Sequence, residues 1–370
     1  MAARDLSISV CKGIAIILMV AGHAEAPELF TNFIYTFHMP LFFITAGYFF
    51  SRRHADNPWD FCQRRFKGLY MPFLKWSLLF LVLHNFWFNI GLLNEQYGNW
   101  TGGVTHPYSW KQFFSRLLSI FYSMSGYDEF LAGAFWFFRG LLVASLLFLV
   151  LFLLIDRKLK LPMHQSAALI CIGAVAFMAF HVYSGVKMTY YPNGFWRETW
   201  GIFFFGIGVI YRYYEPKIPS GGFLSLLYLA ILCIAAWFHF SGMNNGCLPR
   251  DLWSLPLTGC VGFLMVRHAS KIICGRESRL KRTLVFIGEN TLYVFIFHII
   301  SFKAVSLIKI WWYDLDPAQI GCHMVIHYNH TDFFWVLYTV AGTALPLLGL
   351  QCYRKVKSRL TSRSLSMVED

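Results

Sequence analysis

The chain has 370 residues, of which 57% are hydrophobic and 14% are charged. Soluble domains contain roughly 25% charged residues, so this composition excludes an ordinary soluble domain and favours a protein embedded in the lipid bilayer. The formal net charge of +13 does not indicate a nucleic-acid partner, because the cytoplasmic loops of membrane proteins are rich in lysine and arginine.

Ten apolar stretches follow one another along the chain. Several have the ~20 residues that a helix needs to cross a hydrocarbon core. Their apolar residues are continuous rather than alternating, which excludes a transmembrane β-barrel. We therefore predict an all-α polytopic membrane helix bundle with about ten transmembrane helices, two of which (199–211 and 252–267) are short. The stretches lie at about 6–24, 32–50, 71–92, 131–155, 165–183, 199–211, 222–240, 252–267, 286–310 and 333–351.

Lysine and arginine residues between the stretches predict the orientation. With the N-terminus inside, the internal loops hold 21 of these residues and the external loops hold 6. Both termini are therefore predicted to be cytoplasmic. Residues 1–352 would form one membrane-embedded domain, followed by a basic cytoplasmic tail at 353–370. A signal peptide at residues 1–26 is the alternative for the first stretch. Homo-oligomer formation stays open.

Ionisable side chains lie inside several predicted spans, where they are costly unless they have a function. His23 ends the first span, His38 lies in the second, Arg139 in the fourth and His298 in the ninth. Imidazole is well suited to proton transfer near neutral pH. Under the predicted orientation the four groups share the middle-to-outer layer, so they would form a polar pocket if they converge. The alternative for each is a packing residue, and we interpret two further histidines in that way, His181 and His239.

Basic residues gather on the opposite, cytoplasmic side. Arg64, Arg65 and Lys67 precede the third span, and Lys12 lies between this layer and the histidine layer. Guanidinium groups bind phosphate in a bidentate manner, which favours a phosphate clamp. The alternative is that these basic residues only mark the cytoplasmic side of the membrane and bind no ligand. A second such cluster precedes the ninth span, at Arg276, Arg279, Lys281 and Arg282.

Three weaker features lie in predicted external loops. The long loop 93–130 contains a segment from Trp110 with a helical apolar face, which we predict to lie on the membrane surface. Cys247 and Cys322 both lie in these loops and are candidates for a disulfide bond. The alternative is that each is a free thiol that packs like a small hydrophobic side chain. No metal site is predicted, because the helically spaced histidines in this region are better explained as a solvated surface: His323, His327 and His330.

Several motifs, in order along nearly the whole chain, resemble the acyltransferase 3 family of membrane O-acyltransferases, especially the branch related to fucose O-acetylases. The first is a basic residue followed by ten residues and a histidine, and the last is Gly288-Glu289-Asn290-Thr291-Leu292-Tyr293 leading to a histidine. The matching runs are Lys12 to His23, Phe37-His38-Met39-Pro40 to Phe49, the basic stretch ending in Pro72-Phe73, Phe135-Trp136-Phe137-Phe138, and Gly288 to His298.

The chain departs from this family pattern at three positions. Lys12 stands where arginine is common, which keeps the charge but removes the fork of donors. Ser9 replaces an aspartate three residues before the basic residue, and Ala46 replaces a serine. The missing aspartate puts in doubt any acid that would pair with Lys12, and Asp5, two helical turns away, is a poor substitute.

The resemblance implies transfer of an acyl group, with acetyl expected, from cytoplasmic acyl-CoA to a hydroxyl of a carbohydrate or glycan. It also implies a multi-pass protein of the cytoplasmic (inner) membrane whose first span is retained. Acyl-CoA would be a co-substrate, and no permanently bound cofactor is expected. A proton-coupled transporter and a non-catalytic acyl-CoA-binding protein are the alternatives.

Roles for individual residues follow from this expected reaction. His23 would be the general base, with a covalent acyl-histidine as the alternative. His298 would orient the acceptor or stabilise the oxyanion with Arg139, and His38 would hydrogen-bond His23. CoA would be held by Lys12, Arg64, Arg65 and Lys67, and the substrate by Trp136, Glu289 and Asn290.

Overall fold

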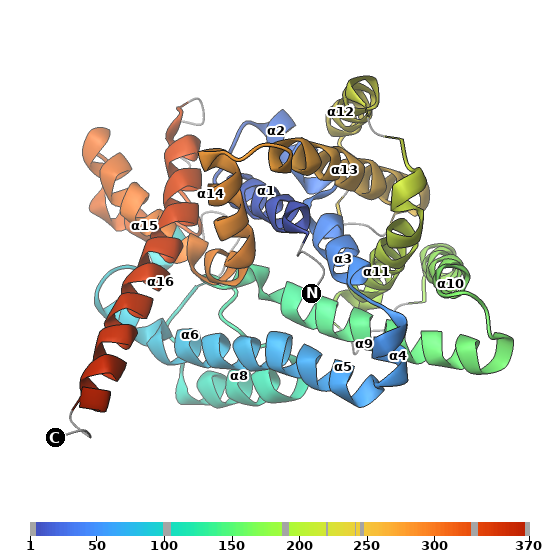
Figure 1. Cartoon of the computed structure of the whole chain (residues 1–370). Helices are drawn as coiled ribbons and strands as arrows, with labels where there is room; N and C mark the ends of the chain where they lie inside the picture. The colour runs from blue at the N-terminus through green and yellow to red at the C-terminus, as the bar shows by residue number, and fades with distance from the viewer. Residues whose placement is uncertain are drawn as a thin grey trace.

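The computed structural model describes residues 5–98, 105–186, 192–219, 221–240, 242–244, 248–326 and 332–366. In these ranges the chain folds into helices without any strand, which confirms the predicted all-α polytopic bundle (Figure 1). Eight helical segments are long and apolar enough to cross a membrane. The count of ten spans and the side on which each terminus lies stay predictions.

The second predicted span is interrupted just before His38. α1 covers Leu6–His23, α2 covers Glu28–Tyr35 and α3 covers His38–Tyr48, with Thr36 and Phe37 between the last two. Pro40 accounts for the break, since proline lacks a backbone N–H and is tolerated in the first turn of a helix but not in its interior. His38 thereby becomes the first residue of α3.

The third span begins earlier than predicted and contains a widened turn. α4 covers Arg52–Asp56, and α5 (Pro58–Arg65) continues through a π-helical turn at Phe66–Tyr70 into α6 (Met71–Asn89). The widened turn directly precedes Pro72, whose missing N–H disturbs the regular hydrogen-bond ladder. The basic residues predicted for the loop therefore lie on a helix that runs without a gap into the span.

The apolar segment of the loop 93–130, which was predicted to be external, lies along α6. α7 covers Glu95–Gly98 and α8 covers Trp110–Ser123. Asn85 of α6 exchanges two hydrogen bonds with the backbone of Tyr108, and the Tyr70 hydroxyl donates to the Phe121 carbonyl at 3.1 Å. α8 thus runs antiparallel to α6 over most of that helix's length (Figure 1). Large apolar side chains such as Trp110 and Leu118 stay exposed on α8, and its place at the membrane surface stays a prediction.

The ninth predicted span is also divided, at Asn290. α14 is a separate amphipathic helix that packs along α1, and α15 begins only at Thr291. The two stretches that are short by hydropathy belong to longer helices, α11 and α13. The remaining helices are α9 (Trp136–Leu159), α10 (Met163–Ser184), α11 (Trp196–Tyr214), α12 (Gly222–Trp237), α13 (Asp251–Cys274), α14 (Arg279–Glu289), α15 (Thr291–Trp312) and α16 (Phe334–Ser366).

The contact between α1 and α14 depends on two glycines. A Cβ atom on Gly288 would lie 1.7 Å from the Ser9 carbonyl oxygen, and one on Gly13 would lie 2.4 Å from the Leu284 carbonyl oxygen. Because these neighbouring atoms belong to the backbone, they cannot move aside without shifting a helix. The close approach fixes α1 against the segment that leads into α15.

Gly288→Ala is therefore expected to destabilise the fold by about 1–3 kcal/mol or more, because its methyl group would overlap the backbone of α1. The measurement is the thermal unfolding midpoint of the purified protein in detergent. Gly173→Ala in α10 is the matched control, since a Cβ there meets no atom within 4 Å. Equal midpoints for the two variants would contradict the close-contact explanation.

Candidate active site

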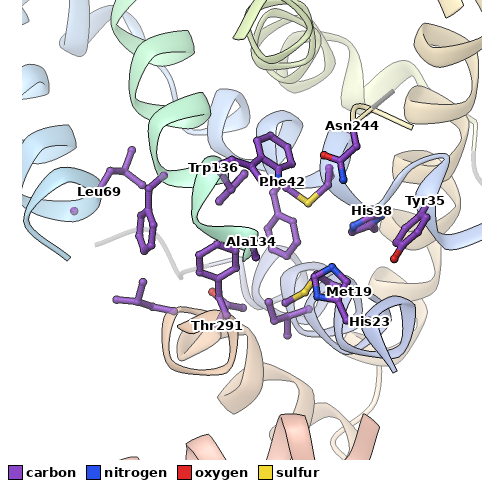
Figure 2. Close-up of a pocket in the computed structure, with 17 residues that line it drawn as sticks. Met19, His23, Tyr35, His38, Phe42, Leu69, Ala134, Trp136, Asn244 and Thr291 are labelled. Atoms are coloured by element: carbon purple, nitrogen blue, oxygen red, sulfur yellow. The ribbon is translucent and has the colours of Figure 1, made fainter. Parts of the chain in front are cut away.

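A cavity of about 170 Å³ lies among α1, α3, α9, α15 and the π-helical turn (Figure 2). Most of its wall is apolar, with side chains such as Met19, Phe42 and Phe295. Its polar side chains come from separate elements and are His23, Tyr35, His38, Asn244 and Thr291. Asp, Glu, Lys and Arg are absent from the lining residues that the structure describes.

His23 and His298 form a hydrogen-bonded pair. Nδ1 of His23 lies 2.9 Å from Nε2 of His298, with the ring centroids 5.1 Å apart. Nδ1 of His298 lies 2.9 Å from the Phe295 carbonyl and 3.2 Å from the Val294 carbonyl. A carbonyl can only accept, so His298 carries its proton on Nδ1 and its Nε2 is an acceptor. His23 must then donate from Nδ1, which leaves Nε2 of His23 with an unprotonated lone pair.

Both ring nitrogens of His298 already have hydrogen-bond partners in the protein. The side chain is buried, and its two ring nitrogens bond to His23 and to its own helix. It has no second donor to offer to an oxyanion, so the geometry favours its action through His23 alone.

His38 lines the cavity but bonds elsewhere than predicted. Its Nδ1 lies 2.9 Å from the carbonyl oxygen of Ile34, one turn earlier across the break between α2 and α3. The prediction of a hydrogen bond to His23 is wrong for the described structure, where the Nδ1 partner of His23 is His298. Nε2 of His38 is left as an acceptor.

Lys12 and His23 lie on the same face of α1. Ile16, Met19 and His23 all line the cavity. Lys12 precedes His23 by eleven residues, which is close to three helical turns and ~16 Å along the axis. The basic residue and the histidine therefore point to the same side of the helix, and this is the physical reason for their spacing.

The predicted phosphate clamp adjoins the cavity without lining it. Gly68 and Leu69, in the π-helical turn, form part of the wall. Arg65 lies one turn earlier and stacks over the rings of Phe61 and Phe205, at 4.9 and 5.5 Å. The other two basic residues are exposed, with Arg64 paired to Asp60 at 2.9 Å and Lys67 open to solvent.

Arg139 is a buried partner of an acid that the sequence analysis missed. Its Nε lies 3.1 Å from Glu198 of α11, and the two side chains are 5% and 0% exposed. Arg139 does not line the cavity, whereas Trp136, one turn earlier, does. Arg197, next to Glu198, lies over the Trp136 ring at 4.6 Å. Arg139 and Glu198 therefore lie behind the residues that line the cavity and are not part of its surface.

Two predicted substrate-binding residues, Glu289 at the end of α14 and Asn290 between α14 and α15, do not line the cavity. Glu289 is exposed, and Asn290 is buried with its amide donating to the Phe286 carbonyl at 2.8 Å. Arg354 of α16 donates to the Asn290 side-chain oxygen at 2.9 Å. The next residues, Thr291 and Leu292, line the cavity instead.

Other histidine and cysteine predictions have mixed outcomes. His181 is buried, as expected of a packing residue, but His239 is exposed beyond α12 and bonds to Asn32. His323 packs against the Phe130 ring, so it is not a fully solvated residue, and burial followed by nearby Lys303 lowers its pKa. Cys322 is a buried free thiol. Cys247, His327 and His330 lie outside the described residues.

Asp5, the acid nearest to the missing aspartate, is engaged by Arg267. Their side chains are 2.8 Å apart, and Asp5 also accepts from Ser7 at the start of α1. Burial alone would raise the pKa of Asp5, but the hydrogen bonds from Ser7 and the charge of Arg267 outweigh it and lower the pKa. Glu215 is the second acid on Arg267, at 2.7 Å.

Asp5→Asn is expected to lower the thermal unfolding midpoint at pH 7. Because the pKa of Asp5 is lower in the folded protein, its stabilising effect exists above the unfolded pKa and is lost as pH falls through the folded value. The difference in midpoint between wild type and Asp5→Asn should therefore shrink when both are measured at pH 3. A difference that stays constant with pH would contradict the ion pair.

Arg139→Met should destabilise the protein by about 3–5 kcal/mol, because it leaves the Glu198 carboxylate buried without this counter-charge. Adding Glu198→Gln to Arg139→Met should restore part of the loss. Thermal unfolding of the two single variants and the double variant measures the coupling. Additive effects of the two changes would show that the pair is not coupled.

Comparison with known protein families identifies the family of this chain. Residues 5–351 match the family model of the acyltransferase 3 family, described as an acyltransferase domain. Neither the search of curated proteins nor the search of solved structures gave a match. The match spans all the helices that build the cavity, and on this evidence the chain belongs to the acyltransferase 3 family and is a multi-pass membrane acyltransferase.

Proposed function

We propose that the protein transfers an acyl group, with acetyl as the expected group, from cytoplasmic acyl-CoA to a hydroxyl of a carbohydrate or glycan at the cytoplasmic (inner) membrane. The observation that carries the proposal is the hydrogen bond from His23 to His298, which holds His23 in one tautomer inside an apolar cavity. The assignment to the branch related to fucose O-acetylases stays a prediction.

His23 has the properties of a general base. Its Nδ1–H is held by His298, so the unprotonated Nε2 is available for the acceptor hydroxyl. As Nε2 takes the hydroxyl proton, the oxygen attacks the thioester carbonyl and forms the new C–O bond. The C–S bond then breaks, and the CoA sulfur leaves with the proton that His23 returns.

His298 supports this cycle without carrying a charge. When His23 becomes an imidazolium, its Nδ1–H still donates to the neutral Nε2 of His298. In serine-protease triads a buried aspartate holds the histidine in a comparable way. A neutral acceptor suits a cavity whose described lining has no cationic residue to balance a carboxylate.

The end of the cavity lined by Gly68 and Leu69, away from His23, suits the acyl-CoA donor. An extended pantetheine arm is roughly 15–20 Å long, comparable to several residues at ~3.5 Å each. The distance from Lys12 to His23 along α1 is ~16 Å, so a thioester could reach the base while the CoA phosphates stay near basic side chains. Gly68 and Leu69 place the Arg64-Arg65 segment beside this end.

Replacement of His23 by alanine should lower acyl transfer by ~10²–10⁴-fold, because the general base is lost. The assay is transfer of radiolabelled acetyl from acetyl-CoA to membrane glycans. His181→Ala, at a buried histidine outside the cavity, is the matched control and should keep its activity. Membrane abundance is measured for both variants. Wild-type activity in His23→Ala would exclude the assignment, and solute uptake without acyl transfer would favour a transporter.

His298→Leu should lower the rate constant kcat by at least ~10-fold, because Nδ1 of His23 loses the acceptor that fixes its tautomer. His298→Gln offers a side-chain carbonyl that can accept the same bond and should retain more activity. Thermal unfolding of the two variants separates this effect from loss of packing. Equal activity in both would show that the hydrogen bond is not required. Acyl-CoA binding without any transfer in the wild type would favour a non-catalytic protein.

A further inference from the structure

Four polar side chains gather at one end of the cavity, away from Gly68 and Leu69. His23 ends α1, Tyr35 ends α2, His38 begins α3, and Asn244 belongs to the short described segment 242–244 (Figure 2). The close-up shows them on the side of the cavity opposite Leu69. The cavity therefore has an apolar end and a polar end.

Three of these four groups present acceptors rather than donors. His23 and His38 each use Nδ1–H within the protein, so their Nε2 atoms are lone-pair acceptors. The Tyr35 hydroxyl donates to the Gly22 carbonyl at 2.7 Å, which leaves its oxygen to accept. A ligand matching this end must bring donors, and hydroxyl groups supply them.

The charge of that ligand is limited by the same residues. A phosphate or carboxylate would meet acceptors and no cation among the described lining side chains. An ammonium group would bring donors but would lie in a mostly apolar cavity without a carboxylate, which is costly. An uncharged ligand with several hydroxyls fits best.

Close contacts hold the segment that carries the polar end in place. A Cβ atom on Gly242 would lie 2.3 Å from the Tyr35 carbonyl oxygen, and one on Gly262 would lie 2.2 Å from the Phe37 side chain. Thr258 donates to the Thr36 carbonyl at 3.1 Å. These contacts fix the break between α2 and α3, and with it the positions of Tyr35 and His38.

We infer that the polar end recognises an uncharged acceptor with two neighbouring hydroxyls, one activated by His23 and the other donating to Nε2 of His38. Asn244 supplies an amide to the same end. His38 is then a specificity-determining residue and not the base. The inference rests on the proposed acyl transfer and names the feature of the acceptor that this site selects.

The test compares two probes that differ by one hydroxyl, cis-1,2-cyclohexanediol and cyclohexanol, with radiolabelled acetyl-CoA as donor. Acetylated product and released CoA are measured separately with purified wild-type protein. The wild type should prefer the diol by kcat/KM. His38→Leu should lose about tenfold of that preference, as expected for one hydrogen bond. His38→Gln, which restores an acceptor, should regain part of it.

His181→Leu is the matched control, because this buried histidine lies outside the cavity, and its preference should equal that of the wild type. Diol preference that persists in His38→Leu would overturn the inference, and so would equal use of both probes by the wild type. Either result would leave the proposed acyl transfer intact. CoA release without any acetylated probe would also overturn it and leave the donor reaction standing. Absence of CoA release from the wild type would remove the proposed function as well.

Discussion

The hydrogen bond between His23 and His298 is the interaction on which the site depends. It joins the last residue of α1 to the third turn of α15, two helices far apart in the sequence, at the wall of a mostly apolar cavity that His23 lines. His298 accepts this bond at Nε2, so the bond fixes which nitrogen of His23 bears the proton. A single pair of neutral rings thereby decides which side of the imidazole faces a substrate, without burying a net charge.

Three interruptions in otherwise regular helices build the space around this pair. The break before His38, the end of α14 at Asn290 and the π-helical turn at Phe66–Tyr70 all border the cavity. An unbroken helix would present only side chains there, whereas an interruption brings a helix start or an irregular backbone to the wall. Such irregular backbone is tolerated at membrane depth where protein or a cavity, rather than lipid, surrounds it.

Hydropathy was enough to predict the all-α bundle. Depth along the spans was enough to place His23 and His38 at one cavity, with His298 bonded to His23 behind the lining. The interruptions were missed because hydropathy does not report where the backbone hydrogen-bond ladder breaks. Two of them fall inside stretches predicted as single spans, and the π-helical turn falls in a segment predicted as a loop. The role of Arg139 was misjudged because Glu198 lies just outside an apolar stretch, and partners across helices depend on how each helix is rotated. Tyr35 and Asn244 gave no signal, since a lone tyrosine or a loop asparagine is ordinary until the fold brings it to a site.

The shared face of Lys12 and His23 has a consequence for how this chain can vary. A regular helix turns by about 100° per residue, so one inserted or deleted residue between the two would swing the lysine round to a different side of α1. Exchange of lysine for arginine keeps the positive group on that side. The length of this segment is thus under tighter constraint than the identity of its basic end, and a Lys-for-Arg change is one that the architecture can absorb.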